Sequence, residues 1–386
     1  MRILFITQKV DRDDDLLGVY HEWIAELSKR VERVVVICLM RGAVVLPKNV
    51  EVYSLGKEQE HNANSAKGYA NGAKKLRRIT RFYRYVFALR RDYDVVFVHM
   101  NTVYVLLGWW VWKLFRKPVV LWFAHYRPHW QLRVANALVD KIVTSVPEAC
   151  AIRSEKITVV GQGIDTERFS RGNVPPDTTG GSTSQFRILF LGRISPVKDL
   201  ETLINAVNLL RSHGMEFHLN VVGAPTDMVR RGSPSKDAAY FEGIKRKVEE
   251  LRLGKWISFL GRVPNHTTPE IYAGHDCFVN LTATGSFDKS ILEAMACEVP
   301  VFVSNRAYER IFPEDLRQRL MFREKSAADC AEKIEALIKA SPEERAAISR
   351  QLREIVVCDH NIKNLASRLA KIFEKLGVRL AELPTG

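Results

Sequence analysis

Short runs of aliphatic and β-branched residues alternate with amphipathic stretches along most of the chain. The first series has a run at residues 2–7, an amphipathic stretch at 20–31 and a second run at 34–39. Such runs are apolar throughout, which is typical of parallel strands covered by helices on both faces of the sheet. The alternation therefore predicts an α/β fold built on parallel sheets.

One segment interrupts this alternation. Residues 171–185, RGNVPPDTTGGSTSQ, are rich in Pro, Gly, Ser and Thr and read as a linker. A chain of 386 residues also exceeds the roughly 250–300 residues at which a single core stops growing. We predict Rossmann-like domains at 1–170 and 186–360, and a C-terminal helix at 361–386 that packs back on the first domain. Further strands are predicted at 95–100, 119–123, 142–144, 157–160, 186–191, 219–222, 257–260, 277–281 and 299–303.

Composition narrows the class of protein. Hydrophobic residues make up 46% and charged residues 26% of the chain, which are ordinary globular values and exclude fibrous and disordered classes. The longest apolar run, 102–112, is shorter than the ~20 residues that span a bilayer, and we expect no secretory signal. The six cysteines form no Cys-x-x-Cys pair, so we predict reduced, buried thiols and a cytoplasmic protein.

Positive charge is concentrated in the first half. Residues 1–170 contain 27 Lys and Arg against 17 Asp and Glu, and nine of the basic residues fall between His61 and Arg91 without one acid. The segment Lys74–Arg91 has apolar residues at helical spacing on one side and basic residues on the other. Two interpretations stay open: a solvated helix that covers the sheet, or a surface that meets an anionic membrane on the inner face of the cell, helped by Phe82 and Phe87. We expect no nucleic-acid partner, because no recognised module accompanies the charge.

Two cations follow the first predicted strand of the second domain. In FLGRISPVKDLETL, Gly192 and Arg193 come directly after the strand, Lys198 lies five residues on, and Asp199 is a good N-cap for a helix to about Ser212. Free N–H groups at a helix start and two nearby cations would bind a diphosphate. The alternative is a plain strand-to-helix turn with two solvated cations.

A second strand-to-helix turn occurs in TGSFDKSILEAMACEVPVF, residues 284–302. Its amides at Gly285, Ser286 and Phe287 could also face phosphate. The one carboxylate within the helix, Glu293, fits two interpretations. It could accept hydrogen bonds from a ribose diol, or it could form a capping box with Ser290 at the Ser-x-x-Glu spacing.

Three segments together resemble a known family. RILFLGRISPVKDLETLINAV, TGSFDKSILEAMACEVPVFVS and VVGQGIDTERF are similar to the retaining, nucleotide-sugar-dependent glycosyltransferases of family 4. The resemblance implies the GT-B fold, in which two Rossmann-like domains have parallel sheets that face across a cleft. It further implies an acceptor-side first domain and a second domain that binds the nucleotide sugar.

The resemblance also implies roles for particular residues. Arg193 and Lys198 match the cations that bind the donor diphosphate, Glu293 matches the ribose-binding glutamate, and His125, after a strand of the first domain, matches a histidine near the donor sugar. As a lone residue, His125 could equally be a polar loop residue. Taking the resemblance and the turn motifs together, we predict three sets of site residues. The set for catalysis is His125, Arg193 and Lys198; for donor binding it is Gly18, Gly192, Arg193, Lys198, Val263, Ser286, Phe287, Asp288, Lys289 and Glu293; for acceptor binding it is Asp13, Tyr20 and His21.

One position departs from the family. The family has two glutamates separated by seven residues, the first of which helps to hold the donor sugar, and this first position is Gly285 here. We hypothesise that Asp288 and Lys289 take over sugar or phosphate contacts.

Two other patterns have weaker interpretations. Asp11-Arg12-Asp13 has the form of a metal-binding Asp-x-Asp motif, but acceptor contact or loop solvation ranks ahead, so no metal and no cofactor are predicted. Gly161-Gln162-Gly163 continues to Thr166 where a dinucleotide fingerprint has its third glycine, which disfavours a dehydrogenase.

The sequence therefore predicts a metal-independent retaining glycosyltransferase. Its donor would be a UDP- or GDP-sugar, and its acceptor a hydroxyl of a saccharide, with a lipid-linked or cell-envelope saccharide leading. The alternative is a noncatalytic GT-B-like protein that binds a nucleotide sugar or a saccharide, which the missing first glutamate allows.

Overall fold

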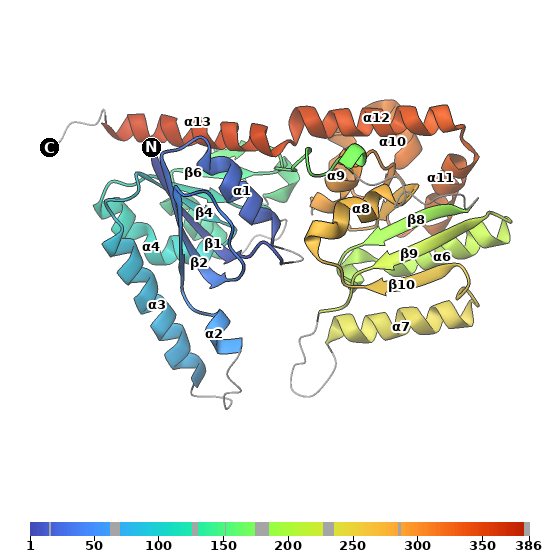
Figure 1. Cartoon of the computed structure of the whole chain (residues 1–386), viewed down its shortest axis with the longest axis horizontal. Coiled ribbons are helices and arrows are strands. Elements are labelled where there is room, and N and C mark those ends of the chain that lie inside the picture. Colours follow the sequence, from blue (N-terminus) through green and yellow to red (C-terminus); the bar gives the residue numbers. More distant parts are fainter. Residues whose placement is uncertain are drawn as a thin grey trace. The chain divides into compact units, whose positions relative to one another are not determined.

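The computed structural model describes residues 1–14, 17–61, 70–125, 130–150, 152–173, 185–226, 235–284 and 287–381. The chain divides into two compact units (Figure 1): Met1–Gly163 with Ile362–Gly386, and Ile164–Asn361. Each unit has one parallel sheet with helices around it, so the predicted fold class of two Rossmann-like, parallel-sheet domains is confirmed. The expected domain limits lay at 170 and 360, and most of the expected linker, 174–184, is outside the described residues.

The sheet of the first unit has the strand order β3-β2-β1-β4-β5-β6-β7, and all its neighbours pair in parallel. The order reverses between β1 and β4, which is the switch point at which open α/β sheets bind ligands. The strands are β1 Arg2–Val10, β2 Arg33–Arg41, β3 Val50–Ser54, β4 Val95–His99, β5 Val119–Trp122, β6 Lys141–Thr144 and β7 Ile157–Val159.

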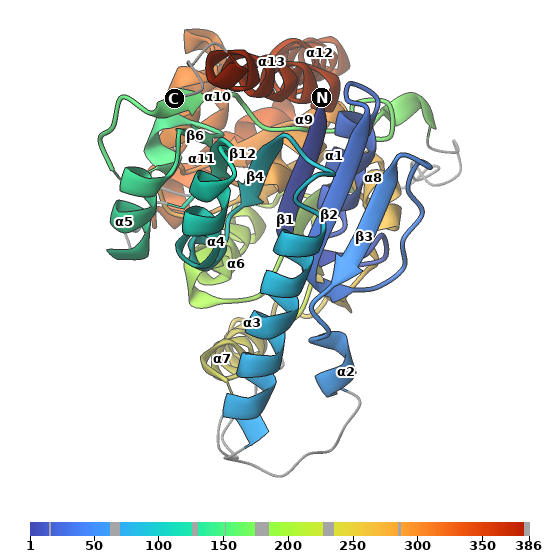
Figure 2. The same ribbon diagram turned by 90° about the vertical axis from the view of Figure 1, so that its left-hand side faces the viewer.

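Helices cover both faces of this sheet. Along β1, Ile3 and Phe5 pack in the core beneath α1 and α13, whereas Leu4 and Ile6 pack in the core beneath α3, α4 and α5, as the two-residue period of a strand requires. In Figures 1 and 2 the amino-terminal part of α3 extends beyond the strands. The helices are α1 Val19–Ser28, α2 Glu58–His61, α3 Ala70–Ala88, α4 Thr102–Leu114, α5 Trp130–Leu138 and α13 Ile362–Ala381.

The last helix of the chain belongs to the first unit. Phe373 of α13 makes an edge contact with Phe97 of β4 at a centroid distance of 5.4 Å, and Ser367 accepts a 3.0 Å hydrogen bond from Arg30. Burial of the α13 face against the first unit stabilises a contact between the last residues of the chain and its first elements.

The second sheet has the order β10-β9-β8-β11-β12, again all parallel. Its strands are β8 Phe186–Leu191, β9 Phe217–Val222, β10 Ile257–Gly261, β11 Cys277–Asn280 and β12 Val301–Val303. Its α-helices are α6 Leu200–Ser212, α7 Lys236–Glu250, α8 Thr268–Ala273, α9 Lys289–Ala296, α10 Glu314–Leu320, α11 Ala327–Lys339 and α12 Pro342–Asp359.

Two predictions about local structure were wrong. Strand β3 was missed, because its residues are all only partly buried and Glu51 breaks the apolar run. Cys358 is exposed, whereas the other five cysteines are buried as predicted. Among the described residues, no helix is long and apolar enough to cross a membrane.

Three glycines with positive φ lie at the carboxyl ends of neighbouring strands: Gly192 (φ 152°), Gly223 (φ 133°) and Gly261 (φ 73°). Gly223 is the most constrained, because a Cβ there would lie 1.9 Å from the carbonyl oxygen of Gly192. Only glycine fits this close approach of two backbones.

We predict that Gly223→Ala lowers the free energy of unfolding by at least about 1–3 kcal/mol, because it adds both a backbone clash and an unfavourable φ. Urea titration of the two proteins measures this. The control is Gly243→Ala within α7, where a Cβ meets nothing within 4 Å, and which should be neutral or stabilising by about 0.5–1 kcal/mol. Equal stabilities for the two variants would contradict the constraint at Gly223.

Candidate functional site

The carboxyl edge of the second sheet brings together most of the residues predicted to bind a donor. Strand β8 ends at Leu191 and is followed by Gly192 and Arg193; its neighbour β11 ends at Asn280. The Gly192 N–H donates to the Val222 carbonyl over 3.0 Å, and a Cβ on Gly192 would meet nothing within 4 Å. The glycine turn therefore has open space beside Gly192 at the carboxyl edge, where α/β sheets bind ligands.

Lys198 and Asp288 form an ion pair at this edge. The Lys198 ammonium contacts the Asp288 carboxylate and donates to the Thr282 hydroxyl over 3.0 Å. The same carboxylate oxygen accepts from the Thr282 hydroxyl (2.7 Å) and the Asn280 amide (3.0 Å). Burial alone would raise the pKa of Asp288, but Lys198 and these donors outweigh it and lower the pKa to about 2. Asp288 is therefore an anion at any physiological pH, and it neutralises Lys198.

This pair changes the expectation for Asp288. A carboxylate repels phosphate, so in this arrangement Asp288 serves as a counter-ion to Lys198 and would not itself hold a phosphate. The neighbouring Lys289 opens α9, and its side chain is half-buried.

Arg193 is less constrained than Lys198. Its side chain is 46% exposed, and its Nε lies 3.9 Å from Asp237 Oδ2, which is too long for a hydrogen bond. A loose, exposed ion pair contributes little, so Arg193 can turn to an incoming anion at small cost.

The expected N-cap Asp199 behaves differently from prediction. It occupies the N-cap position of α6 with φ 44°, but its carboxylate accepts a 2.8 Å hydrogen bond from the Thr202 hydroxyl and caps no helix N–H. The adjacent 3-10 turn at Pro196–Lys198 precedes it, so Lys198 sits immediately before the start of α6.

Glu293 is buried, and the capping-box interpretation is wrong. Helix α9 begins at Lys289 with Asp288 as its N-cap, so Ser290 lies inside the first turn and caps nothing. Glu293 is only 7% exposed, and its Oε2 accepts a 3.2 Å hydrogen bond from the Tyr272 hydroxyl. Burial raises the pKa of Glu293, although Lys289 and Tyr272 oppose this. A buried carboxylate with one hydrogen bond retains capacity to accept others, as a ribose contact needs.

The other residues predicted to bind the donor differ in burial. The Phe287 ring is buried and stacks on Tyr308 at 5.1 Å, so only its backbone could face a ligand. Val263 follows β10 and is half-buried. Gly285 and Ser286 lie outside the described residues.

The first unit holds the remaining predicted residues at the carboxyl ends of its own strands. His125 follows β5 and forms an isolated parallel bridge with Cys150. Gly18 begins α1, and a Cβ there would lie 2.6 Å from the Asp14 carbonyl oxygen, so the preceding loop packs directly on the helix start. The Tyr20 ring lies against His99 at a centroid distance of 4.0 Å.

Of the three residues implied for acceptor binding, only Asp13 has an exposed side chain. His21 is buried, and its Nε2 accepts a 3.0 Å hydrogen bond from the Val45 N–H; burial lowers its pKa. His21 thus holds the 42–47 segment in place, which leaves it poorly suited to contact an acceptor. The Asp-x-Asp pattern is also engaged locally, since Asp11 lies 2.8 Å from the Lys9 ammonium. Within the described residues, no group of three potential metal ligands comes together.

Sequence reasoning missed the neutral residues that hold the charged ones. Asn280 and Thr282 bind Asp288, and Tyr272 binds Glu293. The sequence signal for Asn280 and Thr282 was a pair of polar residues at the end of an apolar strand. Side chains at this position reach the carboxyl edge of a sheet. Tyr272 lies 21 residues from Glu293 on another helix, and no local pattern connects them.

We predict that Asp288→Asn lowers the free energy of unfolding by about 2 kcal/mol and strengthens the binding of inorganic pyrophosphate. Both effects follow from leaving the Lys198 charge without its counter-ion. Urea titration and calorimetry measure them. The control is Asp276→Asn, which removes the same charge beside Arg187 at the opposite end of β11 and should leave pyrophosphate binding unchanged. Weaker pyrophosphate binding by Asp288→Asn would contradict the counter-ion role.

We predict that Glu293→Gln is at least as stable as the wild type near about pH 7. Because the pKa of Glu293 is raised on folding, the folded protein binds the carboxyl proton more tightly than the unfolded chain does. The contribution of this carboxyl to the free energy of unfolding therefore falls as pH rises above 4.5, its ordinary pKa. The advantage of the variant should therefore shrink near about pH 5, as measured by urea titration at both pH values. Exposed Glu354→Gln is the control. A larger destabilisation by Glu293→Gln at the higher pH would refute the assignment.

Comparison with known proteins gives a family match for part of the chain. Residues 178–355 match the family of glycosyl transferases group 1. The chain is 22% identical over 228 residues to the putative colanic acid biosynthesis glycosyltransferase WcaL of Escherichia coli K12, covering 58% of this chain and 52% of WcaL. It is 33% identical over 118 residues to the O-antigen chain mannosyltransferase B of Escherichia coli, covering 30% of this chain and 28% of that protein. The matches thus span about half or less of these curated relatives.

Solved structures match over nearly the whole chain. Sucrose-phosphate synthase from Thermosynechococcus elongatus superposes with a TM-score of 0.79 at 16% identity, covering 98% of this chain and 99% of that one. HepE from Anabaena, solved in complex with UDP and glucose, gives a TM-score of 0.73 at 17% identity, covering 97% and 99%. At these identities the likeness concerns the fold. Residues 178–355 therefore match the glycosyl transferases group 1, within a chain that has the GT-B fold.

Proposed function

We propose that this protein transfers a sugar from a UDP- or GDP-sugar to a hydroxyl acceptor, with the anomeric configuration retained and without a metal ion or other cofactor. The observation that carries the proposal is the cluster at the carboxyl edge of the second sheet. There an open glycine turn and Arg193 follow β8, Lys198 precedes α6, and the buried Glu293 lies on α9. HepE, which shares the fold, has been solved with UDP and glucose.

In this proposal the main catalytic effect is stabilisation of the leaving group. The bond from the anomeric carbon to the diphosphate breaks, and its electron pair leaves with the diphosphate. The acceptor oxygen forms the new bond on the same face and gives up its proton to the departing diphosphate oxygen. Arg193 and Lys198 stabilise the charge that grows on the diphosphate. Glu293 accepts from the ribose hydroxyls, and the family resemblance assigns His125 of the first unit a role toward the sugar.

The Lys198–Asp288 pair adds a condition to this mechanism. Lys198 has to exchange Asp288 for a phosphate oxygen, whereas Arg193 has only a loose partner at 3.9 Å to give up. We therefore assign the larger share of diphosphate binding to Arg193.

For the acceptor we propose a lipid-linked or cell-envelope saccharide. The names of two relatives, which refer to colanic acid and to O-antigen chains, favour this class. So does the basic helix α3, where Arg77 and Arg84 are exposed and Leu76 is 65% exposed. We propose that this helix faces an anionic membrane on the inner side of the cell.

One part of the membrane expectation was wrong. Phe82 is fully buried in the core beneath α3 and cannot contact lipid. Phe87 is partly buried against Trp110 of α4, at a centroid distance of 5.8 Å.

We predict that Arg193→Ala slows turnover roughly tenfold to a hundredfold, because each charge-assisted hydrogen bond is worth on the order of 1.5–3 kcal/mol. Release of nucleoside diphosphate from a panel of donors, with lipid extract as acceptor, measures this. Lys245→Ala, an exposed cation on α7 paired with Glu242, is the matched control and should retain the wild-type rate. A wild-type rate for Arg193→Ala would refute the assignment.

The same assay separates the second candidate function, a noncatalytic nucleotide-sugar or saccharide-binding protein. The missing first glutamate and the neutralised Lys198 are the observations that favour it. Binding of a donor without release of nucleoside diphosphate under any acceptor condition would select this alternative.

A further inference from the structure

A cavity of about 550 Å³ lies in the first unit, at the amino edge of its sheet. It is lined by Arg2, Arg90, Arg91, Phe115 and Lys117. These residues come from three places far apart in the sequence: the start of β1, the segment after α3, and the segment between α4 and β5. The amino edge is opposite to the carboxyl edge, where α/β sheets bind their substrates. The cavity is therefore separate from the predicted residues of this unit.

The cavity carries a large excess of positive charge. Of its four cations, Arg2 pairs with Asp94, with Nη2 2.7 Å from Oδ1. Lys117 donates to the Tyr93 carbonyl over 2.7 Å, and Arg90 donates to the Phe87 carbonyl over 2.8 Å. Carbonyl oxygens carry no net charge, so these two bonds leave the cations unneutralised. The lining residues with Asp94 have an excess of three positive charges, and two further acids near Arg2, Glu32 and Asp92, offset this excess in part.

Burial makes it less favourable to hold these cations close together in their charged forms. It lowers the pKa of Lys117, and the neighbouring Arg2 lowers it further, against the opposing effect of Asp94. Like charges held together repel one another, and a bound anion would relieve this repulsion. Phosphate suits such a site, because guanidinium groups bind its oxygens in a fixed, bidentate geometry.

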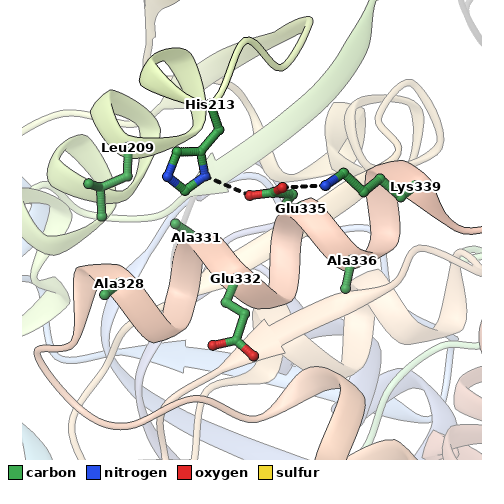
Figure 3. A pocket seen from close by; sticks show the side chains of 8 residues that line it. All are labelled: Leu209, His213, Ala328, Ala331, Glu332, Glu335, Ala336 and Lys339. Carbon is green, nitrogen blue, oxygen red and sulfur yellow. Dashed lines mark hydrogen bonds and ion pairs between the residues drawn. The ribbon is translucent and has the colours of Figure 1, made fainter.

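A cavity in the second unit shows the contrast (Figure 3). It lies between α6 and α11, where His213 Nδ1 is 2.7 Å from Glu335 Oε2 and Lys339 Nζ is 2.5 Å from Glu335 Oε1. Glu332 supplies a second acid to the same lining. Two acids and one lysine give this lining no excess of positive charge, so nothing in it favours an anion.

An exposed apolar surface adjoins the cationic cavity. Phe115, which lines the cavity, lies 6.2 Å from the Phe87 ring, and Phe87 in turn contacts Trp110. Trp110 is 42% exposed, and Leu114, one residue before Phe115, is 66% exposed. Aromatic and aliphatic side chains beside basic ones are typical of surfaces that enter the interfacial region of a bilayer.

We infer that this cavity binds the phosphate group of an anionic phospholipid while Trp110 and Leu114 enter the interfacial region of the same bilayer. Free phosphate would satisfy the cations equally, but it would not explain the exposed apolar surface beside them. The inference deepens the membrane surface proposed above for α3 and rests on it only in assuming that the protein meets a membrane. It adds residues from β1 and from the segment before β5, which the charge of α3 alone does not indicate.

The test is cosedimentation with vesicles of phosphatidylcholine, with or without phosphatidylglycerol, at low salt. The cavity variant is Arg90→Gln with Arg91→Gln, and a second variant, Arg91→Glu, guards against a fold defect in the first. Each charge near an anionic surface is worth about 1 kcal/mol, or roughly fivefold in binding, so the double variant should bind phosphatidylglycerol vesicles at least about twentyfold more weakly. Lys255→Gln with Arg350→Gln, two exposed cations of the second unit, is the control and should bind like the wild type.

Further experiments distinguish lipid phosphate from free phosphate as the ligand. They also distinguish the cavity from the α3 surface as the membrane-binding site. Trp110→Ala with Leu114→Ala should weaken vesicle binding but leave calorimetric binding of glycerol 3-phosphate unchanged. Binding of inorganic phosphate without binding of vesicles would overturn the lipid assignment. If Arg77→Gln with Arg84→Gln loses vesicle binding while the cavity variants keep it, the cavity is not the lipid site. The proposal that α3 faces the membrane would still hold. Equal binding to neutral and anionic vesicles would overturn both, without bearing on sugar transfer.

Discussion

Parallel strands that are buried on both faces leave only their ends for polar chemistry. In both units the central strands have buried apolar stretches, as at Ile3–Ile6 and Ile188–Leu189. The cations Arg193 and Lys198 follow the end of β8, and Asp288 is the N-cap of α9. The three glycines after β8, β9 and β10 let the backbones turn close together at that edge. The open turn at Gly192 and the positions of Arg193 and Lys198 all depend on this constraint.

Charge at the edge of the second sheet is arranged in two different ways. Lys198 is held by Asp288 and Thr282, and Asn280 in turn holds Asp288, in a part-buried network that fixes the position of Lys198 but neutralises it. Arg193 is exposed and loosely paired. A buried ion pair gives little net stability but is costly to break, so the network is better understood as a device that positions and restrains Lys198. The ion pair with Asp288 is therefore a better guide to the role of Lys198 than the match of Lys198 to a family position.

The sequence was sufficient for the fold and for the location of the candidate site. Among the described residues, continuous apolar runs predicted all but one strand to within three residues at each end, because burial on both faces leaves an unambiguous pattern. β3 was missed because an edge strand is only partly buried. Glu293 was correctly singled out as unusual, but its spacing to Ser290 matched a capping box by chance. The Lys198–Asp288 pair joins residues 90 positions apart, and the Tyr272–Glu293 pair joins two helices, so neither left a local signal.

The account depends most on the claim that the carboxyl edge of the second sheet binds the diphosphate of a nucleotide sugar. Calorimetric titration of UDP, GDP and ADP, each free and as a sugar conjugate, into the wild type and Lys198→Gln tests this directly. We predict that at least one nucleoside diphosphate binds the wild type, and that Lys198→Gln, whose Asp288 is then an unopposed anion, binds it more than tenfold more weakly. Binding that is absent for all of them, or unchanged by the substitution, would contradict the account.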